Sequence, residues 1–181
     1  MANSDGALKK FVLAIIAGDT DSVLGQLTAL PELARAQFEK GATRQEAQEF
    51  FLQSVGRYIV AGDTALHIAA AAHRTDMARA LVRAGANVHT GNRFGDQPLH
   101  IAARGNPNSE RWNPEAQSAT ITALVEAGGD PDFAFKYALS SIEQNSSDST
   151  KIIPQQSPLL EHEPQSAAPV LPATQSTMHP R

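Results

Sequence analysis

The most informative absence in this sequence is cysteine, of which its 181 residues contain none. Disulfide bonds and thiolate metal sites are therefore excluded. No run of apolar residues approaches the roughly 20 that a membrane-spanning helix requires. The apolar run after Lys9 and Lys10 is short for a signal peptide and lacks a small residue before a cleavage point, so a helix is the better interpretation.

Aromatic residues and unbalanced charge are also scarce. Aromatic side chains make up 6% of the chain, while apolar residues as a whole make up 41%, many of them alanine. This composition favours thin, closely stacked helices over a large globular core. The net charge is −4 with acidic and basic residues interleaved, and no basic cluster indicates binding to nucleic acid or to a membrane surface.

A nine-residue block that occurs twice dominates what remains. The block from Gly62 to Ala70 returns 33 residues later from Gly95 to Ala103, with seven of nine positions identical. Thr64 is a good N-cap, and the apolar positions that follow it have helical spacing. A second apolar stripe then ends at Gly85, where a left-handed residue closes a helix. Each unit is therefore a turn and two short helices, which must stack on its neighbours to bury an apolar face.

The repeated block resembles the signature of ankyrin repeats, whose period is 33 residues. The residues that carry this resemblance are the repeat-motif residues Gly62, Thr64, Leu66, His67, Gly95, Pro98, Leu99 and His100. The resemblance implies an all-α ankyrin-repeat solenoid of about three helix-turn-helix repeats, with turn or hairpin connections. We expect this domain to span residues 1–133.

The outer repeats depart from the pattern. A degenerate first repeat is predicted from Ala7 to Ala17 and from Thr20 to Ala29, where the signature block is missing. An insertion from Glu32 to Val60 follows, and the apolar spacing within it predicts one inserted helix near residues 44–55, docked on the body. The third repeat is stretched by a loop rich in Gly and Pro after Arg104, and its second helix is expected to resume near Glu115.

The C-terminal part, residues 134–181, has a different composition. Phe135, Leu139 and Ile142 have helical spacing, which allows one short capping helix. From Ser140 onward the chain is rich in Ser, Gln and Pro and contains no aromatic residue, so it cannot bury enough apolar area to become ordered. We predict a mostly disordered tail. Pro169 to Pro172 forms a P-x-x-P pattern that an SH3-like groove could accept, although no basic residue flanks it.

Two pairs of polar residues raise the question of a chemical site. His67 and His100 stand one repeat apart without Cys or carboxylates at ligand spacing, so a structural role inside the first helix of each repeat is favoured over metal binding. Asp63 and Asp96 occupy the same turn position in successive repeats. We therefore interpret them as exposed turn residues or helix-start anions, and not as catalytic acids.

The resemblance implies a function in binding. In ankyrin repeats the turn tips and first helices line a concave face that contacts other proteins. Transferred by register, the partner-binding residues predicted on this face are Tyr58, Val60, Asn92, Arg93, Phe94, Asp96 and Arg104; Trp112, in the stretched loop on the opposite side, is a further candidate. Phe94 and Arg93 are the first choices, because aromatic and Arg side chains are frequent interface anchors. Trp112 is either a second anchor or a plug for the stretched loop.

We therefore expect a non-catalytic protein–protein interaction module, cytoplasmic and monomeric, with no cofactor, no metal, and no nucleic acid or membrane as partner. Two alternatives remain open. The chain could be the truncated binding module of a longer enzyme or effector. It could also be a receptor for a small ligand or metal that uses the insertion.

Overall fold

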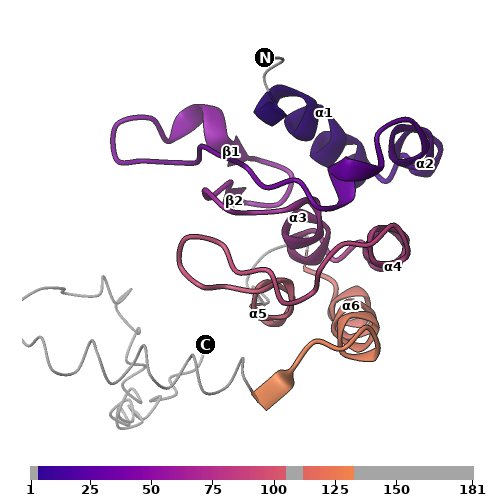
Figure 1. Cartoon of the computed structure of the whole chain (residues 1–181). Helices are drawn as coiled ribbons and strands as arrows, with labels where there is room; N and C mark the ends of the chain where they lie inside the picture. The colour runs from indigo at the N-terminus through magenta and orange to yellow at the C-terminus, as the bar shows by residue number, and fades with distance from the viewer. Residues whose placement is uncertain (1–3, 105–111, 133–181) are drawn as a thin grey trace, which may run out of the picture.

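A computed structural model describes residues 4–104 and 112–132 of the chain, and helices dominate this part (Figure 1). Three pairs of antiparallel α-helices follow one another. Their bounds are α1 Ser4–Ala17, α2 Thr20–Ala29, α3 Ala65–Ala71, α4 Thr75–Arg83, α5 Pro98–Ala103 and α6 Pro114–Glu126. The remaining elements lie between the first two pairs and are the 3₁₀ turns η1 Pro31–Ala34 and η2 Gln48–Phe50 and the strands β1 Phe51–Leu52 and β2 Arg57–Tyr58.

The helices form two rows, as Figure 1 shows. In the inner row α3 packs between α1 and α5, and in the outer row α4 packs between α2 and α6. Small residues make this close stacking possible, since Ala65, Ala69 and Ala70 of α3 are fully buried. The core runs continuously through all three pairs and the segment that connects the first two: Leu8, Phe11, Val12, Ile15, Val23, Leu52, Ile59, Leu66, Ile68, Leu81 and Leu124.

The helix ends follow the chemistry of the repeated block. Thr64 has extended backbone and caps α3, and its hydroxyl accepts a hydrogen bond from the His67 N–H. Gly85 follows the C-cap of α4 with a φ of +93°, the left-handed conformation that glycine adopts without strain. These two residues set where the first helix of the repeat begins and where the second one ends.

The inserted helix predicted near residues 44–55 is wrong. This stretch contains η2 and the strand β1, which pairs antiparallel with β2 through Phe51–Tyr58 and Leu52–Arg57. The ladder continues where the Ile59 N–H donates to the Phe50 carbonyl, and Gly56 closes the turn with a φ of +69°. Leu52 of β1 and Ile59, which follows β2, are both buried in the core.

The insertion is nevertheless docked on the body, as expected. The carboxylate of Asp5 in α1 accepts hydrogen bonds from the N–H groups of Glu39 and Lys40. The Lys9 ammonium donates to the Glu49 carbonyl at 2.7 Å and lies 5.9 Å from the centre of the Phe50 ring. Contacts before the 3₁₀ turn η2 and within it therefore hold the insertion against α1.

The other predicted boundaries agree with the structure where it describes them. The first repeat was expected over Ala7 to Ala17 and Thr20 to Ala29, and it corresponds to α1 and α2. The helix expected to resume near Glu115 is α6. Most of the stretched loop, the possible capping helix, the P-x-x-P pattern and the predicted disordered tail over 134–181 lie outside the described residues. Among the helices described, none is both long and apolar enough to cross a membrane.

Candidate functional site

Four exposed side chains lie on the β1–β2 hairpin and on the turn at 92–95, and we call them the finger surface: Phe51, Tyr58, Arg93 and Phe94. Phe94 is 52% exposed, Tyr58 46% and Phe51 38%, values that are high for large apolar side chains. The Phe51 and Tyr58 rings lie 4.8 Å apart between centroids, and the Arg93 guanidinium lies 4.8 Å from the centre of the Phe94 ring. The finger surface therefore consists of two contact pairs, one from the insertion hairpin and one from the turn at 92–95.

The turn at 92–95 is held by the side chain of Asn92. Its Oδ1 accepts hydrogen bonds from the N–H groups of Phe94 and Asp96, and its Nδ2 donates to Asp63 in the preceding turn at 2.9 Å. The Arg93 N–H donates to the Ala61 carbonyl, and its guanidinium donates to the Ala42 carbonyl in the insertion. Because these bonds join successive turns and the insertion, Arg93 and Phe94 stand on an ordered base.

The two repeated aspartates are buried, which corrects the first of their two expected roles, that of exposed turn residues. Asp63 accepts two hydrogen bonds from the Arg57 guanidinium, one from the Val60 N–H and one from Asn92. Asp96 accepts a two-pronged bond from the Arg104 guanidinium, with both distances at 2.8 Å. Burial of a carboxylate is tolerated here because each one is paired and hydrogen-bonded.

The predicted partner-binding residues divide into two groups. Tyr58, Arg93, Phe94 and Arg104 are exposed, and Tyr58, Arg93 and Phe94 belong to the finger surface. Val60, Asn92 and Asp96 are buried, so the finger surface does not include them. Val60 is covered by the insertion, since a Cβ built on Gly41 would come within 2.8 Å of the Val60 Cα.

Trp112 precedes α6 in the chain and is half-buried near the C-terminal end of α5. Its indole N–H donates to the Gln117 Oε1 at 2.7 Å. The amide nitrogen of Gln117 in turn donates to the carbonyls of Ala102 and Ala103, which have no partner within a helix that ends there. Trp112 therefore orients the residue that caps the last turn of α5, which fits a plug for this region better than an exposed anchor.

Beside the finger surface, the inner-helix face runs along α3 and α5. Ala71 and Ala72 are half-buried there, and Arg104 stands one 33-residue period after Ala71. The Arg104 side chain is 63% exposed although it is paired with Asp96, so it covers the flank of α5 and still meets solvent. The Arg57 guanidinium occupies the corresponding place one repeat earlier, where it also approaches the His67 carbonyl.

His67 and His100 have structural partners in their repeats. The His67 Nδ1 accepts from the Thr64 N–H at 3.0 Å, so Nε2 carries the proton and donates to the Asp96 carbonyl of the next repeat at 2.9 Å. Burial holds the pKa of His67 below its ordinary value, because desolvation disfavours the charged imidazolium. The His100 Nδ1 likewise accepts from the Gln97 N–H. The described residues include no group of three side chains placed to hold a metal ion.

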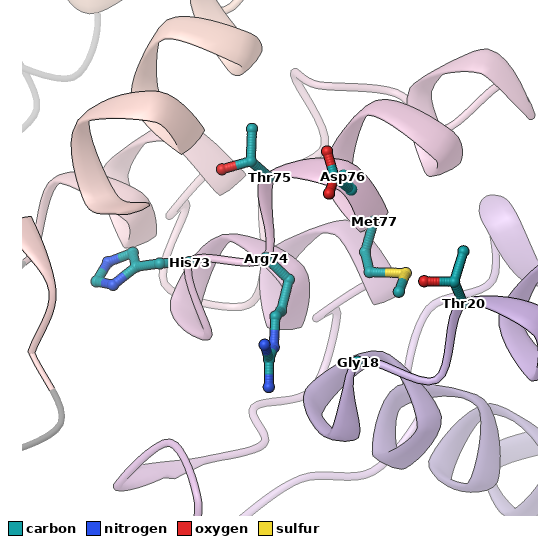
Figure 2. A pocket seen from close by; sticks show the side chains of 7 residues that line it. All are labelled: Gly18, Thr20, His73, Arg74, Thr75, Asp76 and Met77. Atoms are coloured by element: carbon teal, nitrogen blue, oxygen red, sulfur yellow. The ribbon is translucent and has the colours of Figure 1, made fainter. Parts of the chain in front are cut away.

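A shallow depression of about 250 Å³ lies between the α1–α2 turn and the α3–α4 turn (Figure 2). In Figure 2 the Met77 side chain extends toward Thr20, whereas His73 points away to the other side of the chain. The Arg74 guanidinium already donates two hydrogen bonds to the Ile16 carbonyl, so it caps α1. An open, polar depression whose main cation is already bonded does not indicate a ligand site.

Sequence reasoning missed Phe51 and Arg57 as members or supports of this region. Both lie in the insertion, and their roles depend on the β1–β2 hairpin, whose first strand falls within the helix predicted near residues 44–55. The sequence did contain one signal for Arg57. Asp63 and Asp96 repeat at the same turn position, and such a repeated aspartate is a candidate for a buried carboxylate that needs a basic partner.

Comparisons with known proteins agree with the geometry. A family model of ankyrin repeats, made of three copies, matches residues 25–134. The match begins inside α2 and extends beyond α6, so it covers most of the helical part of the chain. A search of curated proteins finds no match.

Proposed function

The chain belongs to the ankyrin repeat family, and from that membership we propose that it is a non-catalytic module that binds another protein through its turn tips and the concave face of its solenoid. Ankyrin repeats generally mediate protein–protein interactions. The proposal assigns the contact to the finger surface and to the adjoining inner-helix face. The carrying observation is the exposed pair Arg93 and Phe94 on the turn at 92–95. Hydrogen bonds within residues 92–96, and others to Asp63, Ala61 and Ala42, hold this turn in place.

Two physical arguments support this assignment. Large aromatic and Arg side chains dominate the energy of protein interfaces when a partner covers them. Phe94 remains 52% exposed in the fold, so a partner can still cover it. An anchor on an ordered base also loses little conformational entropy on binding. Arg93 and Phe94 satisfy both conditions, since the Arg side chain is already positioned over the ring.

The test uses the full chain, immobilised to capture binding proteins from an extract of its source cells. A double variant, Arg93→Ala with Phe94→Ala, should weaken binding of the captured protein by about 2 kcal/mol or more, which is roughly 30-fold. A second double variant, Arg83→Ala with Leu24→Ala, is the matched control. It removes an exposed Arg and an exposed apolar residue from the outer helices α4 and α2.

The control variant should bind as the unchanged chain does, and both variants should keep its melting temperature within a few degrees. Normal binding by the Arg93→Ala and Phe94→Ala double variant would contradict the proposal. If, in addition, a folded His67→Gln variant loses binding, the contact lies at the buried histidine and not at the finger surface.

A further inference from the structure

The inner-helix face presents cations whose carboxylate partners are hidden. The Arg104 side chain is 63% exposed, while its partner Asp96 is 5% exposed. The Arg57 side chain is 18% exposed and its partner Asp63 is fully buried. A ligand that approaches this side therefore meets guanidinium groups before it meets carboxylates, although each pair is neutral as a whole.

Arg93 adds a charge that no acidic side chain balances. Among the described residues its guanidinium forms no ion pair, and its contacts are the Ala42 carbonyl and the face of Phe94. The whole chain has a net charge of −4, whereas this side presents the exposed side chains of Arg93 and Arg104 and the mostly buried side chain of Arg57. Guanidinium groups with free donors bind carboxylates in two-pronged geometry.

The apolar half of the surface lies beside these cations. Phe94 shares its turn with Arg93, and Tyr58 follows Arg57 directly on β2. In Figure 1 the β1–β2 hairpin and the loop before α5 lie next to each other, and the Arg93 N–H to Ala61 bond joins the two segments. Alternation of cationic and aromatic side chains along the turns matches a ligand that alternates carboxylates with apolar groups.

We propose that this surface binds an acidic peptide segment of a partner protein, with its carboxylates at Arg93 and Arg104 and an apolar side chain over Phe94 and Tyr58. The inference rests on the proposed function and adds the chemistry of the partner. The segment is short, because the insertion occupies the flank of α1 through its bonds to Asp5 and Lys9. The open part of the inner face is thus confined to α3 and α5.

Nucleic acid is the other polyanion that three arginines attract. The observations favour a peptide, because nucleic-acid surfaces carry an excess of unpaired Lys and Arg, and here Arg57 and Arg104 are each paired with an acid. A labelled single-stranded oligonucleotide is therefore included in the test. Tighter binding of the oligonucleotide than of the acidic peptide would overturn the inference.

The experiment measures fluorescence anisotropy with the full chain and three labelled octapeptides, alternating Glu–Leu, Lys–Leu and Glu–Ser. We expect Glu–Leu to bind at least tenfold more tightly than either of the other two. Its affinity should fall at least fivefold in Arg93→Gln and in Phe94→Ala, and it should decrease when salt rises from 50 to 300 mM. Arg83→Gln, which removes an exposed Arg from α4, should leave the affinity unchanged.

Equal binding of Glu–Leu and Lys–Leu, or an Arg93→Gln variant with full affinity, would overturn the inference. The outcomes also separate it from the proposed function. If no octapeptide binds, but the captured protein still loses affinity for the Arg93→Ala and Phe94→Ala double variant, the acidic chemistry is wrong and the binding surface stands. If the captured protein binds that double variant as tightly as the unchanged chain, the proposed binding surface is wrong.

Discussion

Replacing Asn92 by Ala should destabilise the fold far more than its position on a turn suggests. The side chain makes three hydrogen bonds, two as acceptor from the N–H groups of Phe94 and Asp96 and one as donor to the carboxylate of Asp63. Asn92 is 7% exposed, so water cannot take over these partners without a rearrangement of the turn. Each truncated bond therefore leaves a partly or fully buried group unsatisfied.

The magnitude follows from these three bonds. A bond between neutral groups contributes about 1 kcal/mol, and one to a charged group about 1.5–3 kcal/mol. Asp63 keeps its bonds to Arg57 and to the Val60 N–H, so the lower end applies to its share. We expect Asn92→Ala to lower the free energy of unfolding by about 3 kcal/mol in total, which is a large fraction of the stability of a domain of this size.

The assay is urea unfolding of the full chain, followed by far-ultraviolet circular dichroism and by the fluorescence of the single Trp. Asn87→Ala is the matched control, because Asn87 is exposed and its Oδ1 accepts only from the His89 N–H. The control should lose less than about 1 kcal/mol. If Asn92→Ala loses no more than Asn87→Ala at an unchanged urea dependence, the network through Asn92 does not stabilise the turns.

Two further predictions concern the repeated block. The pKa of His67 is lowered by burial, so below about pH 6.5 the unfolded chain takes up a proton that the folded chain does not. Stability should be level above that pH and fall below it by up to about 1.4 kcal/mol per pH unit. Urea midpoints at pH 7.5 and 5.5 measure this, and the reasoning fails if the midpoint does not fall or if a folded His67→Gln variant has the same pH dependence. Gln97→Thr should raise the melting temperature, because Thr is the better N-cap and gains up to about 1 kcal/mol for α5. A lower melting temperature would show that Gln97 contributes a bond of its own.

The parts of the fold that local residues determine could be predicted from the sequence. The block at Gly62 carries its own N-cap, apolar stripe and closing glycine, so α3 and α4 follow from signals within one repeat. The insertion could not be predicted in this way. Its apolar residues suit a helix by spacing, but the backbone from Phe50 to Ile59 pairs with itself across a turn, and the Ile59 carbonyl accepts from the Ala42 N–H. That choice depends on tertiary contacts, which override local propensity in short segments.

The candidate site shows the same division. Register placed Arg93, Phe94 and Arg104 at the surface, where the structure has them. It also contained a signal that Asn92 is buried, because Asn92 stands one period after Ile59, which is a core residue. Register could not reveal that Val60 is buried, because the segment around Gly41 packs against it. That segment belongs to the insertion, which has no counterpart in the next repeat.

The way the insertion is fastened has a consequence for the order in which the chain folds. The bonds from Asp5 to Glu39 and Lys40, from Lys9 to Glu49 and from Arg93 to Ala42 connect residues 34 to 51 positions apart. Contacts of such sequence separation form late, since closing a long loop costs entropy before any contact compensates for it. The two helices of each pair, by contrast, are close in sequence and can pack on each other first. The insertion then closes onto the helix pairs, and amide exchange should be fastest in β1 and β2 among the described elements that are not terminal.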